Sequence, residues 1–321
     1  MKEKIITKKI LKWYDLNKRP LPWRKKVSVE KKQYYTLISE FMLQQTQVIT
    51  VIPFFNRFIK NLPSINSLAK VSEKKLIKLW EGLGYYSRAR NLKKSAQVIL
   101  KNFDGKLPDN FEDLITLPGI GNYTANAILA IAFNKPYIPL DGNIERVLKR
   151  YLYLKKDKEI QKDYLLQKKI VFGKTLRSSD YAQALMELGA LICKPNNPIC
   201  AQCPIIKNCK SYKKKDFSLI KNIKKNKDKY FVLKVYKKDQ RYLLIKNTKF
   251  NFLKNLTIFP MEELSNPKNF NENLNFKMSN MNMNIKIEYS NDNKKFPYSY
   301  WIDGTKMNSY MLPSFTKKIV Q

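Results

Sequence analysis

The first two thirds of the chain carry apolar residues at intervals of three and four, which is the spacing of one helix face. The interval recurs from Tyr34 to Phe58, a stretch that predicts a single helix. The same pattern predicts further helices at 73–80, 87–100, 111–117, 123–133, 143–151 and 178–192. We therefore expect a mainly helical domain over residues 1–212.

The pattern changes near residue 213. Residues 213–227 are rich in Lys and poor in apolar side chains, which indicates a linker. Beyond it, β-branched and aromatic residues at 230–236 and 241–245, separated by Lys237–Gln240, predict a β-hairpin. Residues 228–321 are therefore expected to form a smaller mixed α/β domain.

Charge then narrows the range of partners. The 62 Lys and Arg against 26 Asp and Glu give a net charge of +36, which favours a polyanionic partner or an anionic membrane surface. No apolar run is long enough to span a bilayer, and the amino-terminal stretch lacks the apolar core of a signal peptide. We therefore expect a cytoplasmic, nucleoid-associated protein that does not bind membranes, although scattered surface lysines explain part of the charge.

The chain has no histidine, which excludes every His-based catalytic or metal-binding arrangement. Its four cysteines, Cys193, Cys200, Cys203 and Cys209, lie in one short segment, which favours a metal site over disulfides. Zinc sites normally show two short cysteine pairs, and here there is only one Cys-x2-Cys. The unequal spacing predicts a four-iron cluster in the loop 193–209, with zinc as the alternative.

A tight turn, Leu117-Pro118-Gly119-Ile120-Gly121, joins two of the predicted helices, giving a helix-hairpin-helix over residues 111–133. Glycines at Gly119 and Gly121 admit positive φ and close approach of the backbone, and the amides can bind a phosphate. The turn therefore predicts binding to the DNA backbone that does not depend on the base sequence. The alternative is a plain helix–helix connection.

Two carboxylates lie in contrasting settings. Asp141 precedes a predicted helix, where the helix dipole favours its charged form. Glu40 lies inside the apolar stretch 36–52, where burial favours its neutral, proton-donating form. An acid paired with an anion suits cleavage of an N-glycosidic bond, because the base leaves protonated and the sugar becomes cationic. The alternatives are a surface-facing Glu40 and an ordinary Asp-Gly turn at Asp141.

Several motifs together resemble a known group of proteins. The cysteine spacing, 117–121, Leu140-Asp141-Gly142-Asn143 and Leu83-Gly84-Tyr85-Tyr86 resemble the endonuclease III superfamily. Leu21-Pro22-Trp23-Arg24, the run 39–48 and Met186-Glu187-Leu188-Gly189-Ala190 resemble its MutY-type adenine DNA glycosylases. The similarity extends from Leu11 to Cys209 and implies a two-lobed helix-hairpin-helix glycosylase domain with one 4Fe–4S cluster.

The resemblance also implies a role for individual residues. Glu40 would protonate a flipped adenine and Asp141 would stabilise, or briefly bond to, the sugar cation, assisted by Tyr123 and Asn143. The adenine pocket would be lined by Trp23, Arg24, Leu43, Val48 and Glu187. Gln45 and Tyr85 would insert into the duplex beside an oxidised guanine. For Trp23 and Tyr85 the alternative is an ordinary core aromatic.

Tyr123 separates two kinds of enzyme within the superfamily. Members that also cleave the DNA strand carry a lysine nucleophile at this position, and a phenol cannot form the Schiff base that β-elimination needs. The resemblance therefore implies a monofunctional glycosylase acting on adenine opposite 8-oxoguanine or guanine in duplex DNA, and we expect a monomer.

The carboxy-terminal residues resemble the family less closely. Residues 252–260 are similar to a motif of the Nudix-like domain with which MutY proteins recognise 8-oxoguanine, except that Leu253 stands where Trp is usual. Tyr298-Ser299-Tyr300 takes the place of a Phe-Ser-His element, so Ser299 is the expected lesion contact. Two rival functions remain at this point: a glycosylase of the same fold for another base, and a non-catalytic basic DNA-binding protein.

Overall fold

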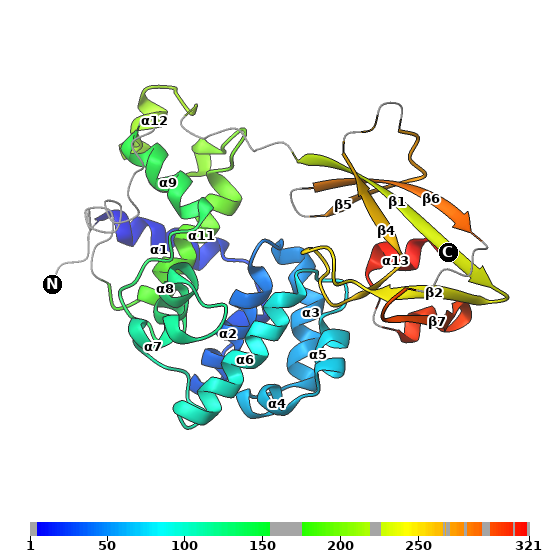
Figure 1. Ribbon diagram of the computed structural model, residues 1–321. Coiled ribbons are helices and arrows are strands. Elements are labelled where there is room, and N and C mark those ends of the chain that lie inside the picture. Colours follow the sequence, from blue (N-terminus) through cyan, green and yellow to red (C-terminus); the bar gives the residue numbers. More distant parts are fainter. Residues whose placement is uncertain are drawn as a thin grey trace. The chain divides into compact units, whose positions relative to one another are not determined.

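The computed structural model describes residues 5–154, 175–218, 226–265, 267, 270–278, 281–290, 296–310 and 312–319. Contacts between Cα atoms divide the chain into two compact units (Figure 1). The first unit comprises Met1–Lys70 and Asn91–Asn222, and the second comprises Val71–Arg90 and Ile223–Gln321. Part of the predicted linker, residues 219–225, lies outside the described residues.

The first unit is helical, as the apolar spacing predicts. Its helices are α1 (Ile5–Asn17), α2 (Val29–Leu43), α3 (Val48–Asn61), α4 (Ile65–Lys70), most of α6 (Tyr86–Asn102), α7 (Phe111–Thr116), α8 (Asn122–Ile131), α9 (Gly142–Leu152), α11 (Ser178–Glu187) and α12 (Lys210–Lys213). A π-helical turn, Leu188–Ile192, continues α11. No helix among the described residues combines the length and apolar character that a membrane span requires.

The prediction of one helix from Tyr34 to Phe58 is wrong. α2 ends at Leu43 and α3 begins at Val48, and the connection passes through Gln45, whose φ is +56°. A residue in the left-handed region interrupts the helical hydrogen bonds. Glu40 consequently lies in the last turn of α2, close to a loop, rather than in the middle of a long helix.

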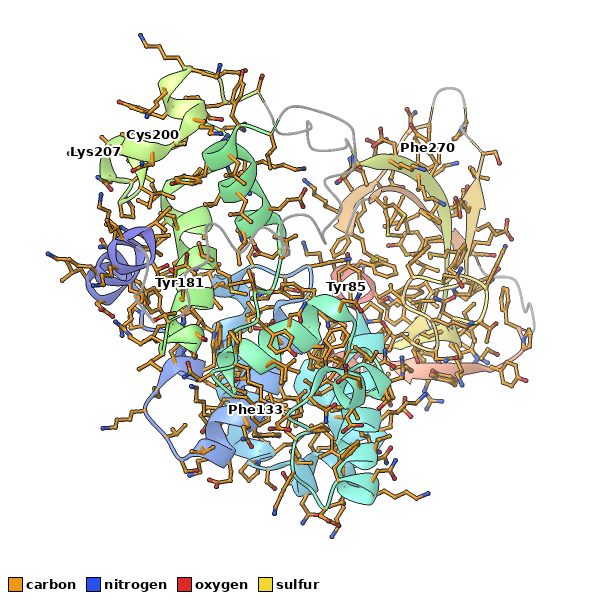
Figure 2. The ribbon with its side chains drawn as sticks, turned by 90° about the vertical axis from the view of Figure 1, so that its left-hand side faces the viewer. Tyr85, Phe133, Tyr181, Cys200, Lys207 and Phe270 are labelled. Carbon is orange, nitrogen blue, oxygen red and sulfur yellow. The ribbon has the colours of Figure 1, made fainter. Side chains whose placement is uncertain are left out.

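The core of the first unit forms where α1, α2, α8, α9 and α11 pack together (Figure 1). α1 packs against α11, and α11 packs against both α8 and α9. The side chains of Ile10, Val147, Tyr181 and Leu185 are at most 3% exposed, and Figure 2 labels Tyr181 within this packing. Burial of such large apolar groups fixes how the helices cross, and therefore where their ends meet.

The second unit contains α5 (Glu73–Trp80) and a mixed sheet. Its described strands are β1 (Lys227–Lys238), β2 (Arg241–Lys246), β3 (Thr257–Ile258), β4 (Met261–Leu264), β5 (Leu274–Met278), β6 (Met281–Ser290) and β7 (Ser299–Asp303). The predicted hairpin is confirmed, because β1 pairs with β2 in antiparallel fashion, whereas β6 runs parallel to β1. α13 (Ser314–Lys318) buries Phe315 in the apolar core beside this sheet.

Candidate active site

Glu40 is a buried acid. Its side chain lies in the last turn of α2, and the residue is 5% exposed. Burial, reinforced by the charge of Asp141, raises the pKa of Glu40 from 4.5 to about 7. The hydroxyl of Tyr123, near the start of α8, donates a hydrogen bond to the Glu40 carboxylate, and this bond and the charge of Arg24 oppose the rise in its pKa. Glu40 can therefore hold a proton at neutral pH and release it to a ligand.

Asp141 is held by the start of α9. As the N-cap residue, it accepts a hydrogen bond from the Ile144 amide at 2.6 Å, and its other oxygen accepts one from Asn143 Nδ2 at 2.9 Å. These bonds favour the carboxylate, as the predicted helix dipole does. Burial outweighs them and raises the pKa of Asp141 above its usual 3.8.

The two carboxylates nevertheless differ in the sense that the sequence predicts. The hydrogen bonds from Ile144 and Asn143 act on Asp141 alone, whereas the charge of Asp141 raises the pKa of Glu40. A charged Asp141 therefore favours the protonated form of Glu40. The fold thus brings together one acid and one anion from positions 40 and 141.

An ion-pair network joins the start of the unit to α11. Glu187 is 1% exposed and accepts hydrogen bonds from Arg19 Nε and Nη2, both at 2.8 Å. Arg24 Nη2 lies 2.9 Å from Glu187 Oε1, and Arg24 Nε donates to Gln183 Oε1 at 2.7 Å. A buried carboxylate bound by two guanidinium groups is held in one orientation.

The remaining residues of the predicted adenine pocket come from the segment before Arg24 and from α2 and α3. Trp23 lies next to Arg24 in the chain and packs edge-on against Phe55 of α3, with ring centres 5.2 Å apart. Leu43 ends α2, one helical turn after Glu40, and Val48 begins α3; both are half-buried.

The helix-hairpin-helix motif forms between α7 and α8. Gly119 has a φ of +83°, and an added Cβ would lie 2.8 Å from Asn91 Cβ and 2.9 Å from Phe41 Cε1, so only glycine fits. Gly121 differs from the prediction, because its φ is −102° and an added Cβ would meet no atom within 4 Å. Gly121 is the N-cap of α8 and leaves the helix amides open to an anion.

The loop between α2 and α3 is tied to this hairpin. Gln44 Nε2 lies 3.4 Å from both the Gly119 carbonyl and Thr124 Oγ1. The next residue, Gln45, is exposed and adopts its left-handed conformation. Strained backbone at an exposed polar residue is typical of a functional loop.

In the second unit, Tyr85 shows the same conformation, with a φ of +47° and 38% of its surface exposed (labelled in Figure 2). The side chains of Trp80 and Arg88 support its loop. Trp80 Nε1 and Arg88 Nη2 donate to the Gly84 carbonyl at 3.0 and 3.2 Å, and the Arg88 guanidinium lies 5.2 Å from the centre of the Tyr85 ring. Tyr85 is therefore an exposed aromatic residue and not a core residue.

The four cysteines line a single cavity, together with residues of α9. Figure 2 places Cys200 on the short turns beside α12. None of the four forms a disulfide. Burial first, and then the neighbouring thiolates, raises the pKa of Cys203 to about 12 and also raises that of Cys209. A positive group among the thiols would favour their ionised form in this cavity, so the site fits a metal cluster.

The expected lesion contacts lie on and beside β7 in the second unit. Ser299 Oγ donates to the Phe296 carbonyl at 2.8 Å, and the Tyr300 hydroxyl is hydrogen-bonded to that of Thr257. Tyr298 is 73% exposed with a φ of +56°, and Leu253 also has a positive φ, of +54°. Leu253 thus has a strained backbone itself, and Tyr300 lies two residues after one that has.

Three residues of the site were missed by sequence reasoning. Arg19 precedes the Leu21–Arg24 motif and could have been noticed as a second cation there. Arg146 Nη2 donates to Asn143 Oδ1 at 2.7 Å and its Nε to the Cys193 carbonyl at 2.7 Å. An added Cβ on Gly189 would lie 2.6 Å from Asn143 Cβ. Two acceptors of Arg146, the Cys193 and Gly189 carbonyls, lie more than 40 residues away in the chain, and so its role had no local signal. Gly189 belongs to the motif 186–190, but its contact with Asn143, 46 residues away, could not be read from the sequence.

The family of this chain follows from comparisons with known proteins. The model of the HhH-GPD superfamily of base excision DNA repair proteins matches residues 38–170. An adenine DNA glycosylase of Buchnera aphidicola subsp. Schizaphis graminum (strain Sg) is 40% identical over 266 residues, which cover 80% of this chain and 74% of that protein. The chain belongs to the adenine DNA glycosylase family.

A second relative and a solved structure also match. The adenine DNA glycosylase of Buchnera aphidicola subsp. Baizongia pistaciae (strain Bp) is 45% identical over 221 residues, covering 68% of this chain and 61% of that protein. A thermostable thymine-DNA glycosylase structure has a TM-score of 0.57 and 28% identity, covering 65% of this chain and 96% of its own. The predicted fold class, a helical glycosylase domain with a separate mixed sheet, is therefore confirmed.

Proposed function

We propose that this chain hydrolyses the N-glycosidic bond of adenine mispaired with 8-oxoguanine or guanine in duplex DNA. Membership of the family makes it a DNA N-glycosylase of base excision repair. The observation that carries the proposal is the pairing of a buried Glu40, whose pKa is raised to about 7, with Asp141 held at a helix start.

The geometry suggests a division of labour between the two carboxyl groups. Glu40 donates its proton to a ring nitrogen of the flipped adenine, and the electron pair of the breaking N-glycosidic bond goes to the base. Asp141, positioned by Asn143, stabilises the positive charge that develops on the sugar. A water molecule then adds to the sugar and returns a proton to Glu40, so the acid is regenerated.

Tyr123 supports hydrolysis without strand cleavage. Burial, followed by the charge of Glu40, raises the pKa of the Tyr123 hydroxyl well above 10, so it remains a neutral hydrogen-bond donor. It has no amine with which to form a Schiff base. We assign it to orienting the Glu40 carboxyl group.

Recognition of the mispair is assigned to residues that project from strained loops. Gln45 and Tyr85 have positive φ and exposed side chains, which suits insertion into a duplex beside the lesion. Ser299 keeps an acceptor lone pair for the altered edge of 8-oxoguanine, because its proton is donated to Phe296. The hairpin amides at Gly119 and Gly121 would hold the phosphate backbone.

We further propose that Cys193, Cys200, Cys203 and Cys209 hold one 4Fe–4S cluster. The four thiols line one cavity, and their spacing has a single Cys-x2-Cys where zinc sites normally show two short pairs. This arrangement favours a larger inorganic group over a lone zinc ion. The cluster would supply the positive charge that keeps the buried thiolates ionised.

Single-turnover kinetics on three duplexes, with adenine opposite 8-oxoguanine, guanine or thymine, would test the function. We expect excision from the first two, with strand breaks appearing only after alkali, and loss of excision in Glu40→Gln and Asp141→Asn. Duplex binding should survive in both variants. Glu30→Gln is the matched control, because it lies in the first turn of the same helix and is exposed. Wild-type rates in the Glu40 and Asp141 variants, or no excision by the wild type, would refute the proposal.

A further inference from the structure

The chain does not leave the cysteine cavity directly after the fourth cysteine. Residues 210–217, which we name the strap, form α12 and then turn back through Lys215, whose φ is +52°. The Asp216 amide donates to the Ser211 carbonyl at 3.1 Å, closing this turn. The segment that opens the predicted linker is therefore folded against the first unit.

A hydrogen bond and a cation–π contact connect the strap to the end of α9. Tyr153, the left-handed C-cap of that helix, donates its hydroxyl to Asp216 Oδ2 at 2.7 Å. The ammonium group of Lys214 lies 5.0 Å from the centre of the same ring. Asp216 Oδ1 also accepts hydrogen bonds from the Ser218 amide and hydroxyl, at 3.0 and 2.6 Å. These contacts hold the strap in one position at its far end.

Two strap residues, Tyr212 and Phe217, line the cavity of the four cysteines. The Phe217 ring lies 5.4 Å from the Arg150 guanidinium. That guanidinium donates to Cys193 Sγ at 3.5 Å and to the Lys194 and Pro195 carbonyls at 2.6 and 2.7 Å, and the residue is 2% exposed. Phe217 thus contributes to shielding from water a cation that touches a cysteine sulfur.

We propose that the strap is the solvent-side closure of the cluster cavity, latched by Tyr153 and Asp216, and that it limits the access of oxidants to the iron. The inference rests on the proposed cluster. A plain linker gives no reason to fix Asp216 or to place Phe217 against a buried arginine. In a cavity kept dry, the Arg150 charge is poorly screened and stabilises the anionic thiolates more strongly.

The test compares the stability of the cluster in air. Wild type, Tyr153→Phe, Phe217→Ala and Phe217→Leu are purified without oxygen and matched for iron content. After exposure to air, the loss of absorbance at about 400 nm gives the rate of cluster decay. We expect decay to be at least threefold faster in Tyr153→Phe and Phe217→Ala, and close to wild type in Phe217→Leu, which keeps a large apolar group. Lys213→Ala, in the strap but outside the latch, serves as control.

Hydrogen exchange of the amides 211–217 shows whether the strap has opened. Faster exchange together with faster decay supports the proposal, provided that the melting temperature measured without oxygen is unchanged. Faster exchange with wild-type decay overturns it, because an open strap would then not expose the cluster. Unchanged exchange in both Tyr153→Phe and Phe217→Ala overturns it as well. Stoichiometric zinc without iron in the wild type would instead overturn the proposed cluster, and the strap proposal with it.

Discussion

Replacing Glu40 by Gln should make the protein more stable while it abolishes excision. Glu40 has its pKa raised by burial from 4.5 to about 7, so the folded state holds a proton that the unfolded chain releases. Stability from this group is complete below pH 4.5 and is lost as the pH rises towards 7. Gln has nearly the same shape, cannot ionise and does not suffer this loss.

The size of the effect follows from the same pKa. At about 1.4 kcal/mol for each pH unit, the rise from 4.5 to about 7 corresponds to about 3 kcal/mol of unfolding free energy. The difference between Glu40→Gln and wild type should therefore widen by about 3 kcal/mol between pH 4.5 and pH 8 and then level off. For a unit of this size, that corresponds to roughly 6 to 12 °C in Tm.

Urea unfolding of both proteins, followed by circular dichroism at pH 4.5, 6, 7 and 8.5, would measure this difference. Glu30→Gln is again the control. Hydrogen bonds to its own amide and to Ser28 lower the pKa of the exposed Glu30, so its loss should bring no gain as the pH rises. A constant difference between wild type and Glu40→Gln at every pH would refute the reasoning, because Glu40 would then not be held neutral by the fold.

Three further predictions concern the chemistry and the recognition of the lesion. Gly189→Ala should slow single-turnover excision at least tenfold, because the new Cβ would lie 2.6 Å from Asn143 Cβ. Gly142→Ala is the control and should not slow excision, because its new Cβ meets no atom within 4 Å. Equal rates in the two variants would show that Asn143 need not stay in place. Ser299→Ala should reduce the rate ratio between 8-oxoguanine and guanine substrates several-fold, as measured on both duplexes, and an unchanged ratio would remove this residue from recognition. Borohydride should trap little covalent adduct with the wild type, since Tyr123 offers no amine, and efficient trapping would contradict the monofunctional assignment.

The sequence alone was sufficient for features set by local chemistry. The Leu117–Gly121 hairpin was predicted because a positive φ, here at Gly119, has a residue signature. The cysteine segment was predicted because thiols crowded into one stretch have few other uses. The helix and hairpin positions followed from the spacing of apolar residues, which reports which face of each element is buried.

The spacing of apolar residues did not predict the loop between α2 and α3, which is a short polar run. The stretch from Tyr34 to Phe58 keeps its apolar interval across residues 44–47, and so the break between α2 and α3 was not predicted. Gln44 has distant partners in the hairpin, Gly119 and Thr124, which hold the loop in place. Periodicity contains no information about such contacts.

The sequence by itself determined which residues can do the chemistry, while only the tertiary structure decided which of them meet. Glu40 and Asp141 come together because the packing of α2, α8, α9 and α11 fixes where α2 ends and α9 begins. The same packing presses Gly189 against Asn143 and allows Arg19 to reach Glu187. The tertiary structure also decided that burial raises the pKa of Asp141 more than the hydrogen bonds at the start of α9 lower it. The cost of removing a charge from water depends on all the groups that surround it.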